Sequence, residues 1–282
     1  MKNSDEKQGD KTMAKYKRIL ITGAAGRLGS RLRGGLAHLA DTIRLTDVNP
    51  IVDLGPNEEF VQADLDDLDA VVAACEGCDA IVHFGARADE DKWQVILHSN
   101  IIGGYNVYEG ARRGGAKRVV YASSVHAIGF HKIVDQIDAH APHRPDSLYG
   151  VAKCFMEDLS RMYFDKFGLE SVCCRIFSSF PEPADRRHLW SYLSFDDCVR
   201  MVEASLRAPV VEHTILFATS DNRETGFDNR LAGHIGFHPQ DNTEPFRAAM
   251  EAATPEIDPK LPRFRFLGGY MTELPHPDDA KA

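Results

Sequence analysis

The sequence predicts an α/β protein built on a doubly wound parallel sheet of about seven strands. Short apolar, β-type runs alternate with helical patterns from Lys17 to about residue 218. Such alternation favours parallel strands joined by crossover helices that cover both faces of the sheet. No separate second core is evident in the 282 residues. We therefore expect a mobile polar tail at residues 1–16, one domain over 17–282, and a small C-terminal cap at about 220–282 on its substrate side.

The first strand, turn, helix and second strand lie between Arg18 and Asp47. Gly23, Gly26 and Gly29 let a pyrophosphate approach the backbone, and the N–H groups of the following helix supply partial positive charge. Asp47 ends the second strand, where a carboxylate can bind both hydroxyls of an adenosine ribose. It would repel a 2′-phosphate, so the pattern predicts NAD rather than NADP, although Arg27 argues the other way. The expected cofactor contacts here are Gly23, Ala25, Gly26, Arg27, Leu28 and Asp47.

The next short strand, residues 60–65, ends with an acidic residue. In a doubly wound sheet this edge lies beside the adenine, so Asp64 could bind the adenine amino group and Leu65 could touch its face. An N-cap role of Asp64 for a helix over 66–76 is equally compatible with the sequence.

The nearly continuous apolar strand 79–84 is of the type that is buried on both faces of a parallel sheet. It ends in Gly85 and Ala86, where backbone can again approach the cofactor. Asn100 lies on an otherwise apolar face of a long helical pattern over 92–113, and a polar side chain there must find partners. We include all three residues among the expected cofactor contacts.

Tyr149 and Lys153 lie four residues apart, on one face of a helix that begins near Asp146. A phenol with a pKa of about 10 is a poor base at neutral pH, but a neighbouring ammonium and an oxidised nicotinamide favour its phenolate. Tyr149 is therefore the candidate base, and Lys153 would also hold the nicotinamide ribose. Ser124, at the end of strand 117–124, would bind the reacting substrate oxygen. A surface Tyr–Lys pair has the same spacing, but its place behind a glycine-rich strand–helix–strand unit favours chemistry.

The composition argues against several other classes of protein. The 33 basic and 42 acidic residues give a net charge of −9, which disfavours nucleic-acid and anionic membrane partners. No apolar run approaches the roughly 18 residues of a membrane helix, and the polar N-terminus lacks a signal core. Cys75 and Cys78 lack a second pair, and the histidines lack metal-binding spacing, so we expect no metal. The six scattered cysteines suit reduced thiols, and we expect a cytoplasmic protein.

A resemblance to a known family runs from about Lys17 to beyond residue 240. Eight segments mark it: TGAAGRLGS, VQADL, IVHFGA, NIIGGYNVYEGAR, YASSVHAIGF, RPDSLYGVAKCFMEDLSRMYFDKFG, RIFSSFPEP and SFDDCVRMVEASLRAPV. In them the chain resembles the extended-type short-chain dehydrogenases/reductases, and specifically the uronate dehydrogenases. The resemblance implies a Rossmann fold and NAD-dependent oxidation of a pyranose uronic acid at C1, giving the aldarolactone. It implies that Tyr149, Lys153 and Ser124 form the catalytic set, and that His126, Ser178 and Arg187 contact the sugar or its carboxylate.

Two departures from that family concern the sugar hydroxyls. Val125 stands where uronate dehydrogenases have Asn, and Ala88 stands where they have Ser. Both replacements remove hydrogen-bonding capacity from positions that should face sugar hydroxyls. A site that lacks such a partner binds the hydroxyl much less well, so these changes should alter which sugar is accepted.

Two added guanidinium groups concern the anionic end of the substrate. Arg186 stands beside Arg187, and Arg87 stands beside Ala88. Added guanidinium groups suit a sulfonate or phosphate through bidentate hydrogen bonding. Alternatively, Arg87 and Arg186 point to solvent or pair with the neighbouring acids Asp89 and Asp185.

These observations leave more than one function open. The leading substrate is a hexuronate such as glucuronate or galacturonate, and its rivals are 6-sulfo or 6-phospho aldoses such as sulfoquinovose and glucose 6-phosphate. An NAD-retaining sugar epimerase or dehydratase, and a non-enzymatic NAD-binding module, are further alternatives. The resemblance also implies a homo-oligomer, a dimer or larger, that pairs through the helical patterns 92–113 and 147–167.

Overall fold

The computed structural model describes residues 15–279, which contain a seven-stranded parallel sheet in the order β3-β2-β1-β4-β5-β6-β7. The strands are β1 (Tyr16–Thr22), β2 (Ala40–Thr46), β3 (Glu58–Phe60), β4 (Ala80–His83), β5 (Arg118–Ser124), β6 (Glu170–Ile176) and β7 (His213–Ala218). The predicted doubly wound fold is confirmed. The order reverses between β1 and β4, which is the place where open sheets of this kind bind ligands.

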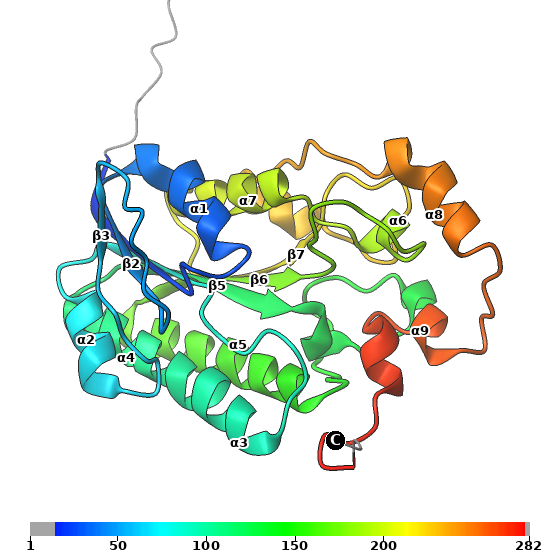
Figure 1. Ribbon diagram of the computed structural model, residues 1–282, viewed down its shortest axis with the longest axis horizontal. Helices are drawn as coiled ribbons and strands as arrows, with labels where there is room; N and C mark the ends of the chain where they lie inside the picture. The colour runs from blue at the N-terminus through cyan, green and yellow to red at the C-terminus, as the bar shows by residue number, and fades with distance from the viewer. Residues whose placement is uncertain (1–14, 280–282) are drawn as a thin grey trace, which may run out of the picture.

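Helices cover both faces of the sheet (Figure 1). One face carries α1 (Gly29–Leu36) and α7 (Phe195–Arg207), and the other carries α2 (Leu68–Cys75), α4 (Gly103–Gly114) and α5 (Leu148–Phe167). Each interface buries its own apolar cluster, with Ile21 and Leu32 in the first and Val119 and Met156 in the second. Burial of these two layers fixes the strands, and thereby the strand ends where the predicted site residues lie.

Three local boundaries differ from the predicted ones. The long helical pattern 92–113 consists of α3 (Trp93–Ile96), a π-helical turn over Leu97–Ile102, and α4. The N-cap of α2 is Asp67, whose side chain accepts the N–H groups of Asp69 and Ala70, so a capping role for Asp64 is wrong. Residues 1–14 of the predicted tail lie outside the described residues, and Tyr16 already pairs with Ala40 of β2.

The chain after β7 adds no second sheet within the described residues. It contains 3₁₀ turns at Arg230–Ile235, Glu244–Phe246 and Gly269–Glu273, and the short helices α8 (Arg247–Ala253) and α9 (Pro262–Arg265). A further short helix, α6 (His188–Ser191), follows β6. In Figure 1 the orange and red part of the chain lies beyond the carboxyl ends of β5 and β6. The C-terminal segment therefore lies on the side of the sheet where a substrate was expected.

The cysteines and the helix lengths bear on the other expectations. All six cysteines are free and buried. Burial raises the pKa of Cys75 to about 12 and that of Cys78 to about 11, so both thiols stay protonated. Among residues 15–279 there is no group of three or more His, Cys, Asp or Glu side chains placed to hold a metal ion. None of the helices in this part of the chain is long and apolar enough to cross a membrane.

Candidate active site

The glycine turn and the end of β4 pack backbone against backbone, without a side chain between them. Gly23 has a φ of +69°, and a Cβ there would lie 2.6 Å from the backbone nitrogen of Gly85. The hydroxyl of Thr22 holds this contact, because its Oγ1 accepts the N–H of Gly85 at 3.1 Å and lies 2.8 Å from Nδ1 of His83. Any side chain larger than hydrogen at residue 23 would fill this space. The predicted contacts Gly23 and Gly85 are thus brought together.

The rest of the glycine turn leads directly into α1. Gly26 donates its N–H to the carbonyl of Gly23 at 3.0 Å, and a Cβ at Gly29 would overlap that same carbonyl. No side chain caps the N-terminus of α1 at Leu28. An anionic pyrophosphate at this position would meet uncapped helical N–H groups and a turn without obstructing side chains. These features fit the diphosphate of a dinucleotide.

Asp47 lies beside this turn, just past the end of β2. One carboxylate oxygen accepts the N–H of Ala25 at 3.0 Å, and the other accepts that of Asn49 at 2.9 Å. The carboxylate is thus fixed at the edge where an adenosine ribose would lie. The guanidinium of Arg27 is directed toward the segment after β6, where it lies 4.9 Å from the ring centre of Phe180.

The expected adenine residues follow β3. Leu65 lies against Gly85 at the end of β4, because a Cβ at Gly85 would come within 2.9 Å of its Cδ1. Its backbone carbonyl accepts a hydrogen bond from Asn106 at 2.8 Å. One oxygen of Asp64 accepts the N–H of Asp66 at 3.1 Å, and a role of Asp64 toward adenine stays a prediction.

Asn100 holds the loop that follows β4. The residue is buried, and its amide donates to the carbonyl of Arg87 at 2.9 Å and accepts the N–H of Arg87 at 3.0 Å. It thereby fixes the chain immediately after Ala86. The partners that the amide of Asn100 requires are therefore the backbone groups of Arg87. A direct contact between Asn100 and the cofactor stays a prediction.

The start of α5 is capped by two side chains. Ser147 accepts the N–H of Gly150 at 2.9 Å. The carboxylate of Glu90 accepts those of Leu148 at 3.0 Å and Tyr149 at 2.8 Å. A Cβ at Gly150 would overlap the carbonyl of His126, so the helix packs directly on the turn that follows β5. This close packing brings Tyr149 next to Ser124. Glu90 was not identified from the sequence, because nothing in its local pattern connects it to a helix 58 residues away.

Tyr149 and Lys153 lie together in a buried environment. Burial raises the pKa of Tyr149 to about 12, against which a hydrogen bond with Ser124 acts. Burial lowers the pKa of Lys153 to about 7, against which Glu157 acts. The Lys153 ammonium donates to the carbonyl of Ala122 at 2.6 Å and lies 5.2 Å from the ring centre of Tyr149. Burial thus disfavours both the phenolate and the ammonium, and an opposite charge placed close by would favour each of them.

A buried ionic network lies directly behind these residues. Glu157, one turn further along α5, accepts Nε and Nη2 of Arg175 at 2.9 and 2.7 Å. It also accepts the hydroxyl of Ser123 at 2.5 Å and lies 2.8 Å from Nε2 of His143. The network joins β5, β6 and α5 at the catalytic end of the sheet. The sequence indicates this network through Arg175, a charged residue within the otherwise apolar strand 170–176.

Three of the expected sugar residues are at least partly exposed: His126, Ser178 and Ala88. His126 lies 2.8 Å from the carboxylate of Asp146, and its ring centre lies 5.8 Å from that of Tyr149. Ser178 accepts a hydrogen bond from Ser191 at 3.0 Å. Ala88 is exposed in the loop after β4.

Val125 belongs instead to the apolar core. It is buried in a cluster with Trp190 and Phe227. This packing explains an apolar residue at position 125 and argues against a place for its side chain among the sugar contacts.

Arg187 is a partly buried cation with incomplete hydrogen bonding. Its Nη2 donates to the carbonyl of Leu267 at 3.1 Å, whereas its buried Nε has no partner within the described part of the chain. A Cβ at Gly269, whose φ is +63°, would overlap the guanidinium. Desolvation lowers the pKa of Arg187. A partly buried, incompletely paired guanidinium suits an anionic ligand.

The other two arginines are engaged elsewhere. Arg186 donates to the carbonyls of Thr254 and Pro255 at 3.2 and 3.3 Å, rather than pairing with Asp185. Arg87 is exposed and pairs with Asp91 at 2.9 Å, rather than with Asp89. The hypothesis of a strongly anionic substrate head depended on both residues, and their contacts weaken it.

Comparisons with known proteins identify relatives of this chain. The model of the NAD dependent epimerase/dehydratase family matches residues 19–209. The uronate dehydrogenase of Pseudomonas putida is 49% identical over 242 residues, which cover 86% of this chain and 90% of that protein. The structure of a glucuronic acid dehydrogenase from Chromohalobacter salexigens has a TM-score of 0.91 at 42% identity, covering 94% of this chain and 100% of that one. A mutant uronate dehydrogenase from Agrobacterium tumefaciens in complex with NAD has a TM-score of 0.88 at 46% identity, covering 92% and 98%.

Proposed function

The chain belongs to the NAD dependent epimerase/dehydratase family, and we propose that within it the chain is an NAD-dependent dehydrogenase that oxidises C1 of a hexuronate to a lactone. The observation that carries this proposal is the partly buried guanidinium of Arg187, whose Nε is buried and has no partner among residues 15–279. It lies at the same edge of the sheet as Ser124, Tyr149 and Lys153. A cation and a candidate base at one edge of the sheet suit an acidic sugar.

The chemistry at C1 is assigned to three side chains. NAD, when bound, supplies the hydride acceptor. The phenolate of Tyr149 takes the proton of the C1 hydroxyl, and the hydrogen-bonded Ser124 holds that oxygen in line. Lys153 stabilises the phenolate through its positive charge, 5.2 Å from the ring centre. The C1–H electron pair departs as hydride, the C1–O bond becomes a carbonyl, and the product is the lactone.

Arg187 and Ser178 anchor the carboxylate at C6. A guanidinium offers two parallel donors to a carboxylate, which fixes the ring so that C1 faces the catalytic residues. Because Arg186 already binds two backbone carbonyls, a single arginine serves the anion. This arrangement favours a monoanionic carboxylate over a phosphate.

Two further proposals concern assembly and location. Exposed apolar side chains lie along α5 at Val151, Phe155 and Met162, and on α4 at Tyr105. They support the predicted homo-oligomer, a dimer or larger, and Phe155→Glu should lower the mass measured by light scattering.

The free buried cysteines suit a reducing compartment, which supports a location in the cytoplasm. Fractionation of the source cells tests this location.

The decisive experiment measures NADH formation with glucuronate, galacturonate, sulfoquinovose and glucose 6-phosphate. We expect turnover of the two hexuronates. Arg187→Ala should raise the KM of the best sugar roughly 100-fold, as expected for loss of a charge-assisted pair of about 2–3 kcal/mol. Arg186→Ala is the matched control and should leave that KM within about threefold, because its contacts are to backbone.

The same assay distinguishes the alternatives. Purified protein that retains NAD and forms no NADH with any free acidic sugar would contradict the proposal in favour of an epimerase or dehydratase. Turnover of glucose 6-phosphate or sulfoquinovose in preference to both uronates would shift the substrate class. A non-enzymatic role would require that Tyr149→Phe leave the biological function unchanged.

A further inference from the structure

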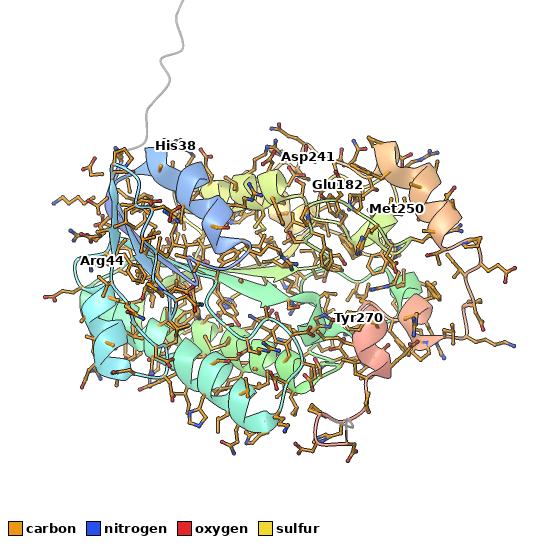
Figure 2. The ribbon with its side chains drawn as sticks, in the orientation of Figure 1. His38, Arg44, Glu182, Asp241, Met250 and Tyr270 are labelled. Carbon is orange, nitrogen blue, oxygen red and sulfur yellow. The ribbon has the colours of Figure 1, made fainter. Side chains whose placement is uncertain are left out.

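Three segments that are distant in the sequence meet above Tyr149 and Arg187. They are the loop after β4 (residues 85–92), the segment that carries Arg187, and the C-terminal residues 266–273. The loop and the C-terminal segment are joined by one hydrogen bond, in which the hydroxyl of Tyr270 donates to Asp89 Oδ1 at 3.2 Å. Figure 2 labels Tyr270 beside the ribbon of the C-terminal segment. From the sequence, Asp89 was named only as a possible partner of Arg87, and Tyr270 was not identified.

The C-terminal partner of this bond is held firmly by its neighbours. Leu267 donates its N–H to the carbonyl of His131 at 2.9 Å, and Gly268 donates to that of Gly129 at 2.9 Å. A Cβ at Gly268 would overlap the carboxylate of Asp146, just as one at Gly269 would overlap Arg187. The backbone therefore passes between an acid and a base of the site, with no room for a side chain. Tyr270 follows immediately, so its position is set by the same contacts.

The loop partner is held on both sides of Asp89. Asn100 binds both the N–H and the carbonyl of Arg87. Glu90 binds the N–H groups of Leu148 and Tyr149. The carboxylate of Asp89 is therefore presented close to the catalytic end of α5. Its charge and Tyr270 both contribute to the raised pKa of Tyr149, after burial, as expected for neighbouring groups.

A sugar bound beside Tyr149 needs hydrogen-bond acceptors for its ring hydroxyls. Ala88 has none on its side chain, and Val125 is packed into the apolar cluster. Asp89 follows Ala88 directly and is exposed; its Oδ1 accepts the N–H of Glu90 at 2.8 Å as well as the hydroxyl of Tyr270, so Oδ2 is the oxygen that remains for a sugar. Tyr270 is 48% exposed, and desolvation and the charge of Asp89 raise its pKa to about 12, so its hydroxyl keeps its proton. The hydroxyl oxygen of Tyr270 can accept one hydrogen bond while Oδ2 of Asp89 accepts another, so the pair can bind neighbouring hydroxyls of a sugar ring.

We propose that Asp89 and Tyr270 form the subsite that binds the ring hydroxyls of the hexuronate, in place of the polar side chains absent at positions 88 and 125. This inference rests on the proposed function. Asp89 accepts a hydrogen bond from a ring hydroxyl, and Tyr270 orients the carboxylate of Asp89 from the C-terminal segment. The carboxylates of Asp185 and Asp146 also place negative charge near Arg187, which opposes the second charge of a phosphate.

The test compares Asp89→Asn and Tyr270→Phe with the wild-type enzyme on glucuronate and galacturonate. Both replacements keep the shape of the side chain. We expect each to raise the KM of the sugar about 10-fold, or 1.4 kcal/mol, with kcat within about threefold and the KM of NAD unchanged. The double variant should lose less than the product of the two, because the residues share a bond. Asp91→Asn, whose partner Arg87 is exposed, is the matched control and should not change the sugar KM.

The outcomes separate this inference from the proposed function. Wild-type turnover of uronates with unchanged sugar KM in both variants would overturn the subsite and leave the dehydrogenase intact. Where the wild type gives no NADH with any uronate, the proposed function falls, and calorimetric binding of glucuronate in the presence of NAD decides the subsite. Binding weakened by Asp89→Asn and Tyr270→Phe, and not by Asp91→Asn, then supports it. Absent or unaffected binding overturns it.

Discussion

Replacing Glu157 by Gln should destabilise the protein by removing the only carboxylate of the described buried network. Glu157 and Arg175 are each 1% exposed, and the acid accepts two hydrogen bonds from the guanidinium. Hydrogen bonds from His143 and Arg175 outweigh burial and lower the pKa of Glu157 to about 2, so the carboxylate is charged at neutral pH. Glutamine keeps the shape but leaves the arginine charge buried without a counterion. Breaking a buried pair in this way costs about 3–5 kcal/mol.

Because glutamine retains one acceptor oxygen, we expect a loss near the lower limit, about 3 kcal/mol, and a Tm lower by roughly 6–12 °C. Urea unfolding at fixed protein concentration measures the free energy, and calorimetry measures the Tm. Asp158→Asn is the control, because Asp158 is the next residue of α5 but is 79% exposed. A loss below about 1 kcal/mol for Glu157→Gln, similar to that of the control, would refute the reasoning that this pair is buried and charged.

Three further predictions concern the pH dependence, the cofactor and the base. Hydrogen bonds with Cys154 and Glu157 raise the pKa of His143 from 6.5 to about 10, so its contribution to stability is complete below pH 6.5 and is lost as the pH rises toward 10. Urea unfolding of His143→Gln across this range should show a smaller decline than the wild type. Asp47→Ser should improve NADP relative to NAD by roughly 10-fold in kcat/KM, because the repulsion of the 2′-phosphate is removed. If the ratio of kcat/KM for NADP to that for NAD stayed equal to the wild-type ratio, the assignment of Asp47 to the ribose would be wrong. Tyr149→Phe should lower kcat by about 10²–10⁴ while calorimetric NAD affinity persists.

Local patterns were sufficient to predict the elements that carry the expected cofactor contacts. The glycine turn, the strand that ends at Asp47 and the spacing of Tyr149 and Lys153 each depend on a short stretch of chain. Parallel topology then requires their carboxyl ends to meet at one edge, and the structure brings Gly23 to Gly85 and Tyr149 to Ser124 there. For these residues the sequence pattern and the geometry have the same physical cause.

The sugar half could not be predicted in the same way, because it depends on contacts between remote residues. The bond between Tyr270 and Asp89 spans 181 positions, and no periodicity encodes it. Val125 was placed among sugar contacts because the uronate dehydrogenases have Asn at this position, but its side chain lies in an apolar cluster that includes residues from after β7. Arg186 was assigned to an anion because it adjoins Arg187, yet it binds carbonyls near residue 254. The partner of each residue comes from the irregular C-terminal segment.

The order of synthesis gives this division a temporal meaning. All predicted cofactor contacts lie between residues 23 and 153, so they emerge from the ribosome before Gly268, Gly269 and Tyr270. A chain that stops before residue 266 would hold every predicted cofactor residue but would lack the segment that packs against Arg187. Arg187 therefore acquires its C-terminal contacts only after the predicted cofactor residues have been synthesised.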